Sequence, residues 1–340
     1  MRSAHFGTTL LAAASFLAVA NAASAAEVSI YTTREPGLIQ PLLDSFSTST
    51  GIKVNTVFLK DGLAERVASE GESSPADILM AVDAGNLVDL VDKGVTQPVD
   101  SAALKEAIPA QLRDADGHWF GLSMRARVVY AAADLDLDAI TYEDLSDPKW
   151  KGKVCIRSGQ HPYNTALTAD YIAHYGAEET EKWLSGLKDN LARKPAGGDR
   201  EGAKDILGGV CDIAVANSYY VGLMRSGKGG DEQKQWADAI KVLLPTFKDD
   251  CTNVNISGAA VAKHAPNKEE AIKLLEYLVS DEAQKIYAEA NYEYPVKTGV
   301  AADPLIAELG DLKIDSKPLT EIVANRKAAS ELVDKVGFDN

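Results

Sequence analysis

The sequence has few cysteines and little positive charge, and both shortages narrow its possible functions. It has three cysteines and no C-x-x-C pair, so a thiolate zinc or iron–sulfur site is not expected. Its formal net charge at pH 7 is -15. Nucleic acids and anionic lipid surfaces attract basic proteins, so this charge argues against both as partners.

Long hydrophobic runs are absent except at the start of the chain. Arg2 precedes an apolar run from Leu10 to Val19, and small residues with A-x-A spacing follow at 20–22 and 23–25. This pattern is typical of a secretory signal peptide and is short for a membrane span, which is the alternative. We therefore predict a signal peptide over residues 1–26 and an exported mature chain that is not inserted in a membrane.

The common catalytic motifs are also missing. There is no G-x-S-x-G elbow, no H-E-x-x-H helix and no evident Ser/His/Asp arrangement. The glycine-containing stretch "PAGGDREGAKDI" lacks the lysine and hydroxyl residue of a phosphate-binding loop, and we interpret it as a turn followed by a helix. We therefore expect no enzyme. A secreted hydrolase stays an alternative, and turnover of an ester, phosphate or peptide by metal-free protein would favour it.

The order of strand and helix patterns predicts an α/β protein with two lobes. Apolar runs such as "VSIYTT", "IKVNTVFL" and "ADILMAV" alternate with amphipathic stretches, as in parallel α/β domains. The run "WFGLSMRARVVYAA" and a segment near 245–255 are expected to cross between lobes as two hinge strands. We predict one lobe from 27–125 plus 253–305 and the other from 126–252 plus 306–340, with a ligand in the cleft between them.

The cysteine positions favour one disulfide. Cys155 and Cys211 each lie near the start of an apolar, strand-like run, in "KGKVCIRSG" and "GGVCDIAVAN". Neighbouring parallel strands can bring two such residues within bonding distance. We predict a Cys155–Cys211 disulfide and a free Cys251.

Tyrosines stand where several strands end. Tyr31 lies at the end of the first strand, Tyr163 follows "KVCI" through a short loop, and the adjacent Tyr219 and Tyr220 follow "CDIAVAN". Ligands of open α/β sheets bind beyond the carboxyl ends of strands, so these phenols are candidates for one site. Packing at the edge of the core is the alternative for any single tyrosine.

Five strings together resemble periplasmic ferric-ion-binding proteins of ABC-type iron uptake systems: "IYTTREPG", "GLSMRARVVYA", "CIRSGQHPYNTAL", "NSYYVGLMRSG" and "NVNISGAAVAKHAPN". The resemblance extends over essentially the whole mature chain. It implies a two-lobed, type II periplasmic binding protein like a transferrin lobe, working as a monomer in the periplasm and delivering Fe(III) to an inner-membrane permease.

The resemblance also implies a ligand set. The family's tyrosine pair matches Tyr219 and Tyr220, and tyrosine-rich members add residues that match Tyr163 and Tyr31. Other members use a histidine and a glutamate from the first lobe, for which no secure counterpart exists here, because Glu35 stands close to the histidine position. His161 is expected to lie beside the site or at the surface rather than to bind the metal.

The chemistry of phenols agrees with a ferric ligand. Ionising one phenol at pH 7 costs roughly 4 kcal/mol, and a hard, highly charged cation offsets that cost best. Fe(II) with fewer ionised phenols stays possible. Arginines near the expected cleft suit a small bidentate anion, and the resemblance points to carbonate; the candidates are Arg34, Arg125 and, as first choice, Arg127. A competing hypothesis is an organic solute held in an aromatic cage.

Overall fold

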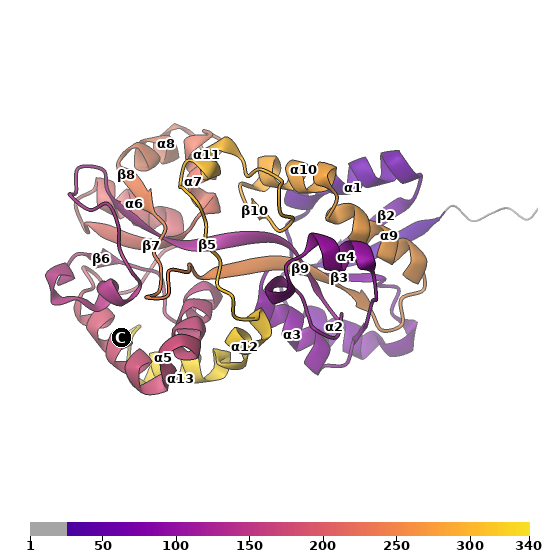
Figure 1. The fold of residues 1–340 in the computed structure, drawn as a ribbon, viewed down its shortest axis with the longest axis horizontal. Helices are drawn as coiled ribbons and strands as arrows, with labels where there is room; N and C mark the ends of the chain where they lie inside the picture. The colour runs from indigo at the N-terminus through magenta and orange to yellow at the C-terminus, as the bar shows by residue number, and fades with distance from the viewer. Residues whose placement is uncertain (1–25) are drawn as a thin grey trace, which may run out of the picture.

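The protein consists of two α/β lobes joined by two long strands (Figure 1), as seen in a computed structural model that describes residues 26–340. The signal peptide predicted for residues 1–26 lies outside the described residues except for Ala26. No helix within residues 26–340 has both the length and the apolar character needed to cross a membrane.

The elements follow one another in a mixed order of strands and helices. The strands are β1 Glu27–Thr32, β2 Lys53–Phe58, β3 Ile78–Ala81, β4 Thr96–Gln97, β5 Phe120–Ala132, β6 Val154–Cys155, β7 Ile213–Asn217, β8 Ile240–Leu243, β9 Val254–Ala262 and β10 Tyr294–Pro295. The helices are α1 Pro36–Thr50, α2 Leu63–Glu70, α3 Ala84–Asp92, α4 Ala102–Ala107, α5 Pro162–Asp189, α6 Asp199–Leu207, α7 Tyr219–Arg225, α8 Asp231–Asp238, α9 Lys268–Leu278, α10 Asp281–Asn291, α11 Pro304–Ala307, α12 Leu319–Ala324 and α13 Arg326–Lys335. Short 3-10 turns cover Gly71–Ser73, Ala110–Leu112, Glu143–Ser146 and Pro148–Trp150.

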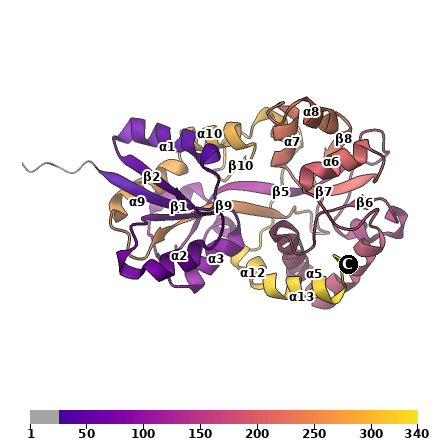
Figure 2. The ribbon, with the colours of Figure 1, turned by 180° about the vertical axis from the view of Figure 1, so that it is seen from behind.

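The strand order explains how the two lobes are connected. It runs β2-β1-β3-β9-β5-β7-β6, so β9 and β5 are the central pair. β1 is parallel to β2 and β3, while β6 is parallel to β7. β5 pairs with β9 through its first half and with β7 and β8 through its second half. Figure 2 shows these two strands passing from one lobe into the other. The lobes are therefore joined by two strands, as predicted, but the second is β9, and the crossing predicted near 245–255 overlaps it only at Val254 and Asn255.

Most predicted elements match the structure, with two departures. The helical pattern of "PLTEIVANRKAASELVDKVGF" predicts one long helix, but the stretch forms two, because α12 ends at Ala324 and α13 begins at Arg326. The patterns "NTALTADYIAHYG" and "EETEKWLSGLKDNLA" predict two helices, but they form one element, α5, which is kinked at Gly176, whose φ is 78°. Only glycine adopts this conformation without strain, so the position of the kink is determined by Gly176. The residue boundaries that we assigned to the lobes stay a prediction.

The predicted disulfide is confirmed. Cys155 ends β6, and Cys211 lies two residues before β7, the parallel neighbour of β6. The two residues are bonded, with their Cα atoms 5.9 Å apart. Cys251 is free and buried. The bond therefore ties the two parallel strands together near the edge of the second lobe.

Candidate functional site

The adjacent tyrosines lie at the turn from β7 into α7. β7 is buried along its whole length, and Ser218 follows it directly. The Ser218 N–H donates to Ala126 O at 3.0 Å, while its Oγ accepts from Ala126 N at 3.1 Å, so the turn is fixed to β5. Tyr219 and Tyr220 begin α7, with ring centroids 4.1 Å apart. The bend lets neighbouring side chains converge, as a straight strand would not.

Tyr163 reaches the same point from the neighbouring strand. It lies in the first turn of α5, where Pro162 takes the first helical position and the His161 side chain accepts from the Tyr163 N–H. Its hydroxyl is 3.3 Å from the hydroxyl of Tyr219. The chain enters α5 after β6, and β6 and β7 are parallel, so their carboxyl ends point the same way. Three phenols from two strand ends therefore meet.

These phenols face a cleft of about 530 Å³ that is lined by residues from both lobes. On the first-lobe side lie Arg34 and Glu35, which follow β1, and the segment from Ala290 to Glu293, which includes the last two residues of α10. The second lobe adds Arg200 and Leu223 to the three tyrosines. The lining thus combines hydroxyl oxygens, carboxylates and cationic groups, which suits a metal ion with an accompanying anion.

Burial keeps the paired phenols protonated in the absence of a ligand. The pKa of Tyr219 is raised well above its ordinary value by burial first and by the nearby Tyr163 and Tyr220. Burial and then Tyr163 also raise the pKa of Tyr220. Neutral phenols crowded this closely form a site that gains much from a cation, because a bound cation lets several protons leave together.

Tyr31 lies apart from this group of phenols, and its role as a metal ligand stays a prediction. Its side chain is buried, and its hydroxyl donates to Glu70 Oε1 at 3.3 Å. Glu70 ends α2 and also pairs with Arg66, so Tyr31 packs against that helix and does not line the cleft. The sequence did predict correctly that Tyr31 lies at the end of the first strand. The pleat of β1 nevertheless turns this side chain toward α2 rather than toward the other tyrosines.

The predicted arginines separate into two groups. Arg34 and Arg125 line the cleft, whereas Arg127 does not. Arg127 is 2% exposed, and its Nη1 donates to Asp199 at 2.6 Å and to Asn217 at 3.0 Å. Its Nη2 donates to Asn164. With its terminal nitrogens engaged, Arg127 joins β5 to the starts of α5 and α6, and its role as the anion partner stays a prediction.

Arg34 is also partly committed. Its Nη1 is 2.9 Å from Glu293 Oε1, and both side chains are buried. The Arg125 guanidinium lies 5.5 Å from the Tyr163 ring centroid, and Arg200 lies 5.6 Å from that of Tyr220. Cations at these positions favour the ionised form of a nearby phenol and attract an anion.

Arg200 and the segment from Asn291 to Glu293 also line the cleft, although neither was predicted from the sequence. Arg200 lies in "PAGGDREGAKDI", which forms a turn and a helix as expected, but the helix start faces the cleft. Tyr292 adopts a positive φ of 58° and lies against α7 from the other lobe. A Cβ at Gly222 would collide with the Tyr292 ring, so this glycine permits the close approach of the lobes. No local sequence motif predicts that Arg200 or this segment lies at the cleft.

A second cavity lies on the opposite side of the hinge strands. It is larger, at about 630 Å³, and is formed mainly between α3, α5, α12 and α13. Asp83, Thr165, Asn255, Leu319 and Arg326 are among its lining residues. No tyrosine of residues 26–340 lines it, and Arg326 pairs with Asp89 at 2.7 Å beside it. The smaller cleft remains the candidate site because the convergent phenols lie there.

Known proteins that are similar to this chain include solute-binding and iron uptake proteins. Residues 73–309 match the profile of the family described as bacterial extracellular solute-binding protein. The chain belongs to that family. This solute-binding protein is 40% identical to iron uptake protein A2 of Synechocystis sp., covering 99% of this chain and 98% of the relative.

Two solved structures are similar throughout. The Bordetella ferric binding protein is 65% identical, with a TM-score of 0.90 over 92% of this chain and 100% of that one. A Trichodesmium protein solved in complex with iron and citrate ligands is 42% identical, with a TM-score of 0.88 over 92% of this chain and 99% of that one. The two-lobed binding-protein fold predicted from the sequence is therefore confirmed.

Proposed function

We propose that this solute-binding protein captures ferric iron in the periplasm through the phenolates of Tyr163, Tyr219 and Tyr220 and delivers it to an ABC-type permease. The observation that carries the proposal is the meeting of three phenols in one interlobe cleft, with two hydroxyls 3.3 Å apart. The names of the relatives, among them an Fe(3+)-binding periplasmic protein of Serratia marcescens, support the choice of ion and of compartment.

The ligand chemistry favours Fe(III) over a softer or less charged ion. Each phenol must lose a proton on binding, at roughly 4 kcal/mol per group at pH 7. Three such groups require on the order of 12 kcal/mol from the metal, which a hard trivalent cation supplies most readily. Fe(II) would leave more of the phenols protonated, and the visible absorption of the complex distinguishes the two.

A small anion would complete the coordination. Three phenolates leave about three positions on an ion that is six-coordinate in all-oxygen sites. Arg125 and Arg200 border the tyrosines without an ion pair to a carboxylate among residues 26–340. Arg200 is the better placed to hold an anion there, because Arg125 is buried and its Nη2 donates to the backbone oxygen of Val82. Carbonate would fit. The iron complex of the Trichodesmium protein contains citrate, which makes a larger carboxylate a second choice.

Capture and delivery would depend on movement of the lobes. A ligand shifts a conformational equilibrium only through its different affinity for the two states. Here the metal ligands come from the second lobe, whereas Arg34, Glu35 and Tyr292 approach from the first lobe. We infer that closure on a loaded cleft creates the surface that a permease recognises. Family membership makes a binding role, rather than catalysis, the expected one.

Colour provides the decisive test. Stripped protein given a ferric chelate should develop a visible phenolate-to-iron band. Tyr219→Phe and Tyr220→Phe should each lose most of the band and bind iron far more weakly, since only a hydroxyl is removed from the fold. Tyr31→Phe is the matched control and should load like the parent.

The alternatives give different outcomes in the same experiment. An aromatic cage for an organic solute would leave the protein colourless with ferric salt, and the proposal would then fail. A band that appears only after ferrous salt is added and air is admitted would indicate capture of Fe(II) followed by oxidation. Unchanged colour in both Tyr219→Phe and Tyr220→Phe would refute the ligand assignment.

A further inference from the structure

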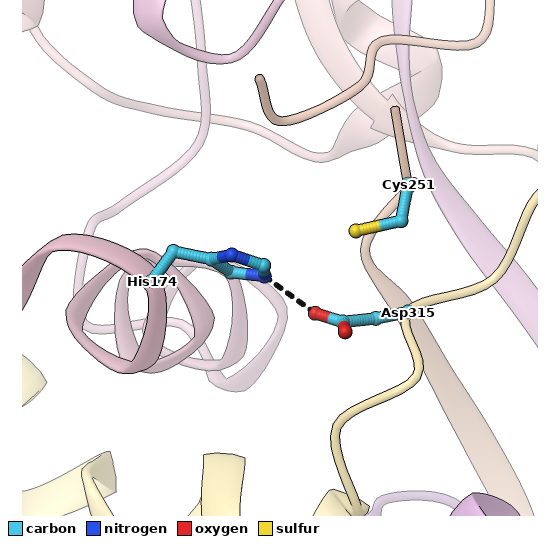
Figure 3. A group of neighbouring side chains, drawn as sticks. All are labelled: His174, Cys251 and Asp315. Atoms are coloured by element: carbon cyan, nitrogen blue, oxygen red, sulfur yellow. Dashed lines mark hydrogen bonds and ion pairs between the residues drawn. The ribbon is translucent and has the colours of Figure 1, made fainter. Parts of the chain in front are cut away.

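A second cluster of metal-ligand side chains lies in the second lobe, away from the tyrosine cleft. His174, Cys251 and Asp315 place a ring nitrogen, a thiol sulfur and a carboxylate oxygen within 4.8 Å of one another. Figure 3 shows the three side chains pointing toward a common centre, each from a different part of the chain. His174 is on α5, eleven residues beyond Tyr163, which corresponds to about 16 Å along the helix. The cluster is therefore separate from the proposed iron site.

A further carboxylate, that of Asp170, lies beside His174 with one oxygen unpaired. Asp170 precedes His174 by one helical turn, so both side chains lie on one face of α5. The Asp170 side chain is fully buried, and its Oδ1 has no hydrogen-bond partner, although it lies 3.6 Å from His174 Nε2. An unpaired, buried carboxylate oxygen is costly unless something cationic occupies the space beside it.

The second carboxylate oxygen of Asp170 and that of Asp315 each accept a hydrogen bond from a residue outside the cluster. Asp170 Oδ2 accepts from Asn253 at 2.8 Å, and Asp315 Oδ1 accepts from the backbone N–H of Lys317 at 2.8 Å. This leaves Asp170 Oδ1 and Asp315 Oδ2 turned inward, and Asp315 Oδ2 is 2.6 Å from His174 Nε2. In each carboxylate, one oxygen accepts a hydrogen bond that fixes the orientation of the group, and the other oxygen points into the cluster. Carboxylates that bind metals are usually held in this way by outer hydrogen bonds.

His174 is oriented in a similar way, with one ring nitrogen bound by a residue outside the cluster and the other pointing into it. Its Nδ1 lies 3.2 Å from Asp249 Oδ2, so an N–H at Nδ1 leaves Nε2 free as a ligand. A carboxylate behind a histidine in this way fixes the ring and raises its basicity toward a metal. Asp249 also accepts from Cys251 Sγ at 3.0 Å, and its side chain is 56% exposed. Asp249 therefore stands where an ion would enter from solvent.

The charge of the cluster also calls for a cation. Three carboxylates surround one imidazole, and none of the three forms an ion pair with a lysine or arginine within residues 26–340. Burial raises the pKa of Asp170 well above its ordinary value, but even with Asp170 neutral and His174 protonated, Asp249 and Asp315 leave one excess negative charge. A divalent ion would balance that charge more fully than a proton.

We propose that His174 Nε2, Cys251 Sγ and Asp315 Oδ2, with Asp170 Oδ1 or a water in the fourth position, bind a divalent transition-metal ion, with Zn²⁺ as the preferred ion. Mixed nitrogen, sulfur and oxygen donors in a tetrahedral set suit zinc, with bonds of about 2.0–2.3 Å. Ligand atoms in such a site are about 3.5 Å apart, so small side-chain rotations close the present cluster. The thiol proton would leave for solvent on binding.

The site would join three segments that meet at the base of a hinge strand. Cys251 comes three residues before β9, and Thr252 N donates to Lys313 O at 2.7 Å, so the cysteine and aspartate segments are already paired. A bound ion would add α5 to this pair. It would also protect the one free thiol of an exported protein from oxidation.

Cobalt makes the test independent of iron. Metal-stripped protein titrated with Co²⁺ should develop a thiolate-to-cobalt band at about one ion per chain. Cys251→Ser should abolish this band, while Tyr220→Phe should keep it. Asp249→Asn, which changes the carboxylate that contacts both His174 Nδ1 and the Cys251 thiol, should weaken Zn²⁺ binding by about 10- to 100-fold. Ferric loading of Cys251→Ser should match the parent, so failure of this site and failure of the iron site give different results.

A second measurement covers the case in which Cys251→Ser folds poorly. In the parent protein, Zn²⁺ should slow alkylation of Cys251 by a maleimide at least tenfold, and an excess of chelator should restore the rate. Absence of a thiolate band in the parent, persistence of the band in Cys251→Ser, or an alkylation rate that ignores Zn²⁺ would each overturn the proposal.

Discussion

If three phenols bind the iron, loading should release about one proton per tyrosine, and this number can be counted. Burial raises the pKa of Tyr219 and of Tyr220, so both are protonated at pH 7 before iron arrives. A ferric ion binds the deprotonated form, and metal binding then releases protons. With Tyr163 included, the tyrosines contribute about three protons per iron.

Replacing one tyrosine should change that number by one. For the parent, the association constant should rise about 1000-fold per pH unit near pH 7, and for Tyr220→Phe about 100-fold. Affinity therefore falls as the pH falls in both proteins, but less steeply in the variant. Tyr31→Phe should behave like the parent, because the Tyr31 hydroxyl donates to Glu70 outside the cleft.

A weakly buffered pH-stat titration with a ferric chelate measures the proton count directly, while the visible band reports the iron taken up. The chelate and any anion contribute the same number of protons in every variant. The difference in proton count between the parent and the variant is therefore the proton released by the replaced phenol. Equal proton counts for the parent and Tyr220→Phe at full loading would refute the assignment. A loss of one proton in Tyr31→Phe would refute our placement of that residue.

Three further predictions concern stability, measured by urea unfolding of iron-free protein. Cys155→Ser opens a disulfide with a sequence separation of 56 and should lower the free energy of unfolding by about 4 kcal/mol. Glu293→Gln leaves Arg34 buried without its carboxylate and should cost about 3 kcal/mol. Burial and then Arg157 lower the pKa of His161 to about 4, so its contribution to stability is present above pH 6.5 and is lost as the pH falls toward 4; His161→Gln should remove that part of the pH dependence.

Each stability prediction has its own control. Reductant should destabilise the parent as much as Cys155→Ser and leave the variant unchanged. Arg34→Met combined with Glu293→Gln should recover part of the loss, because no buried charge is left unpaired. His264→Gln changes an exposed histidine and should keep the parent's pH profile. Identical acid profiles for the parent and His161→Gln would contradict the role given to that histidine.

The candidate site could be predicted only in part. Tyr163, Tyr219 and Tyr220 follow strands whose carboxyl ends point the same way, and that order is visible in the sequence. Tyr31 satisfies the same pattern, but the pleat of β1 and the packing of α2 direct its hydroxyl to Glu70. Strand position is encoded locally, whereas the face that a strand-end side chain takes depends on what packs against it.

Charged residues were harder to place for a similar reason. Arg127 looks available in the sequence, yet its guanidinium is used by Asp199, Asn217 and Asn164, which come from three later parts of the chain. Arg200 looks like an ordinary first-turn residue of a helix, yet it borders the cleft. Ion pairs between distant segments form only after folding, so no spacing reveals them.

By itself the sequence determined the α/β class, the two crossings between lobes, the Cys155–Cys211 bond and the phenols that follow β6 and β7, because hydrophobic period, cysteine position and strand order are local or nearly local properties. Only the tertiary structure decided which arginines remain available and that His174, Cys251 and Asp315 converge. Those contacts join residues as much as 141 positions apart, and their geometry is set by how the helices and hinge strands pack together.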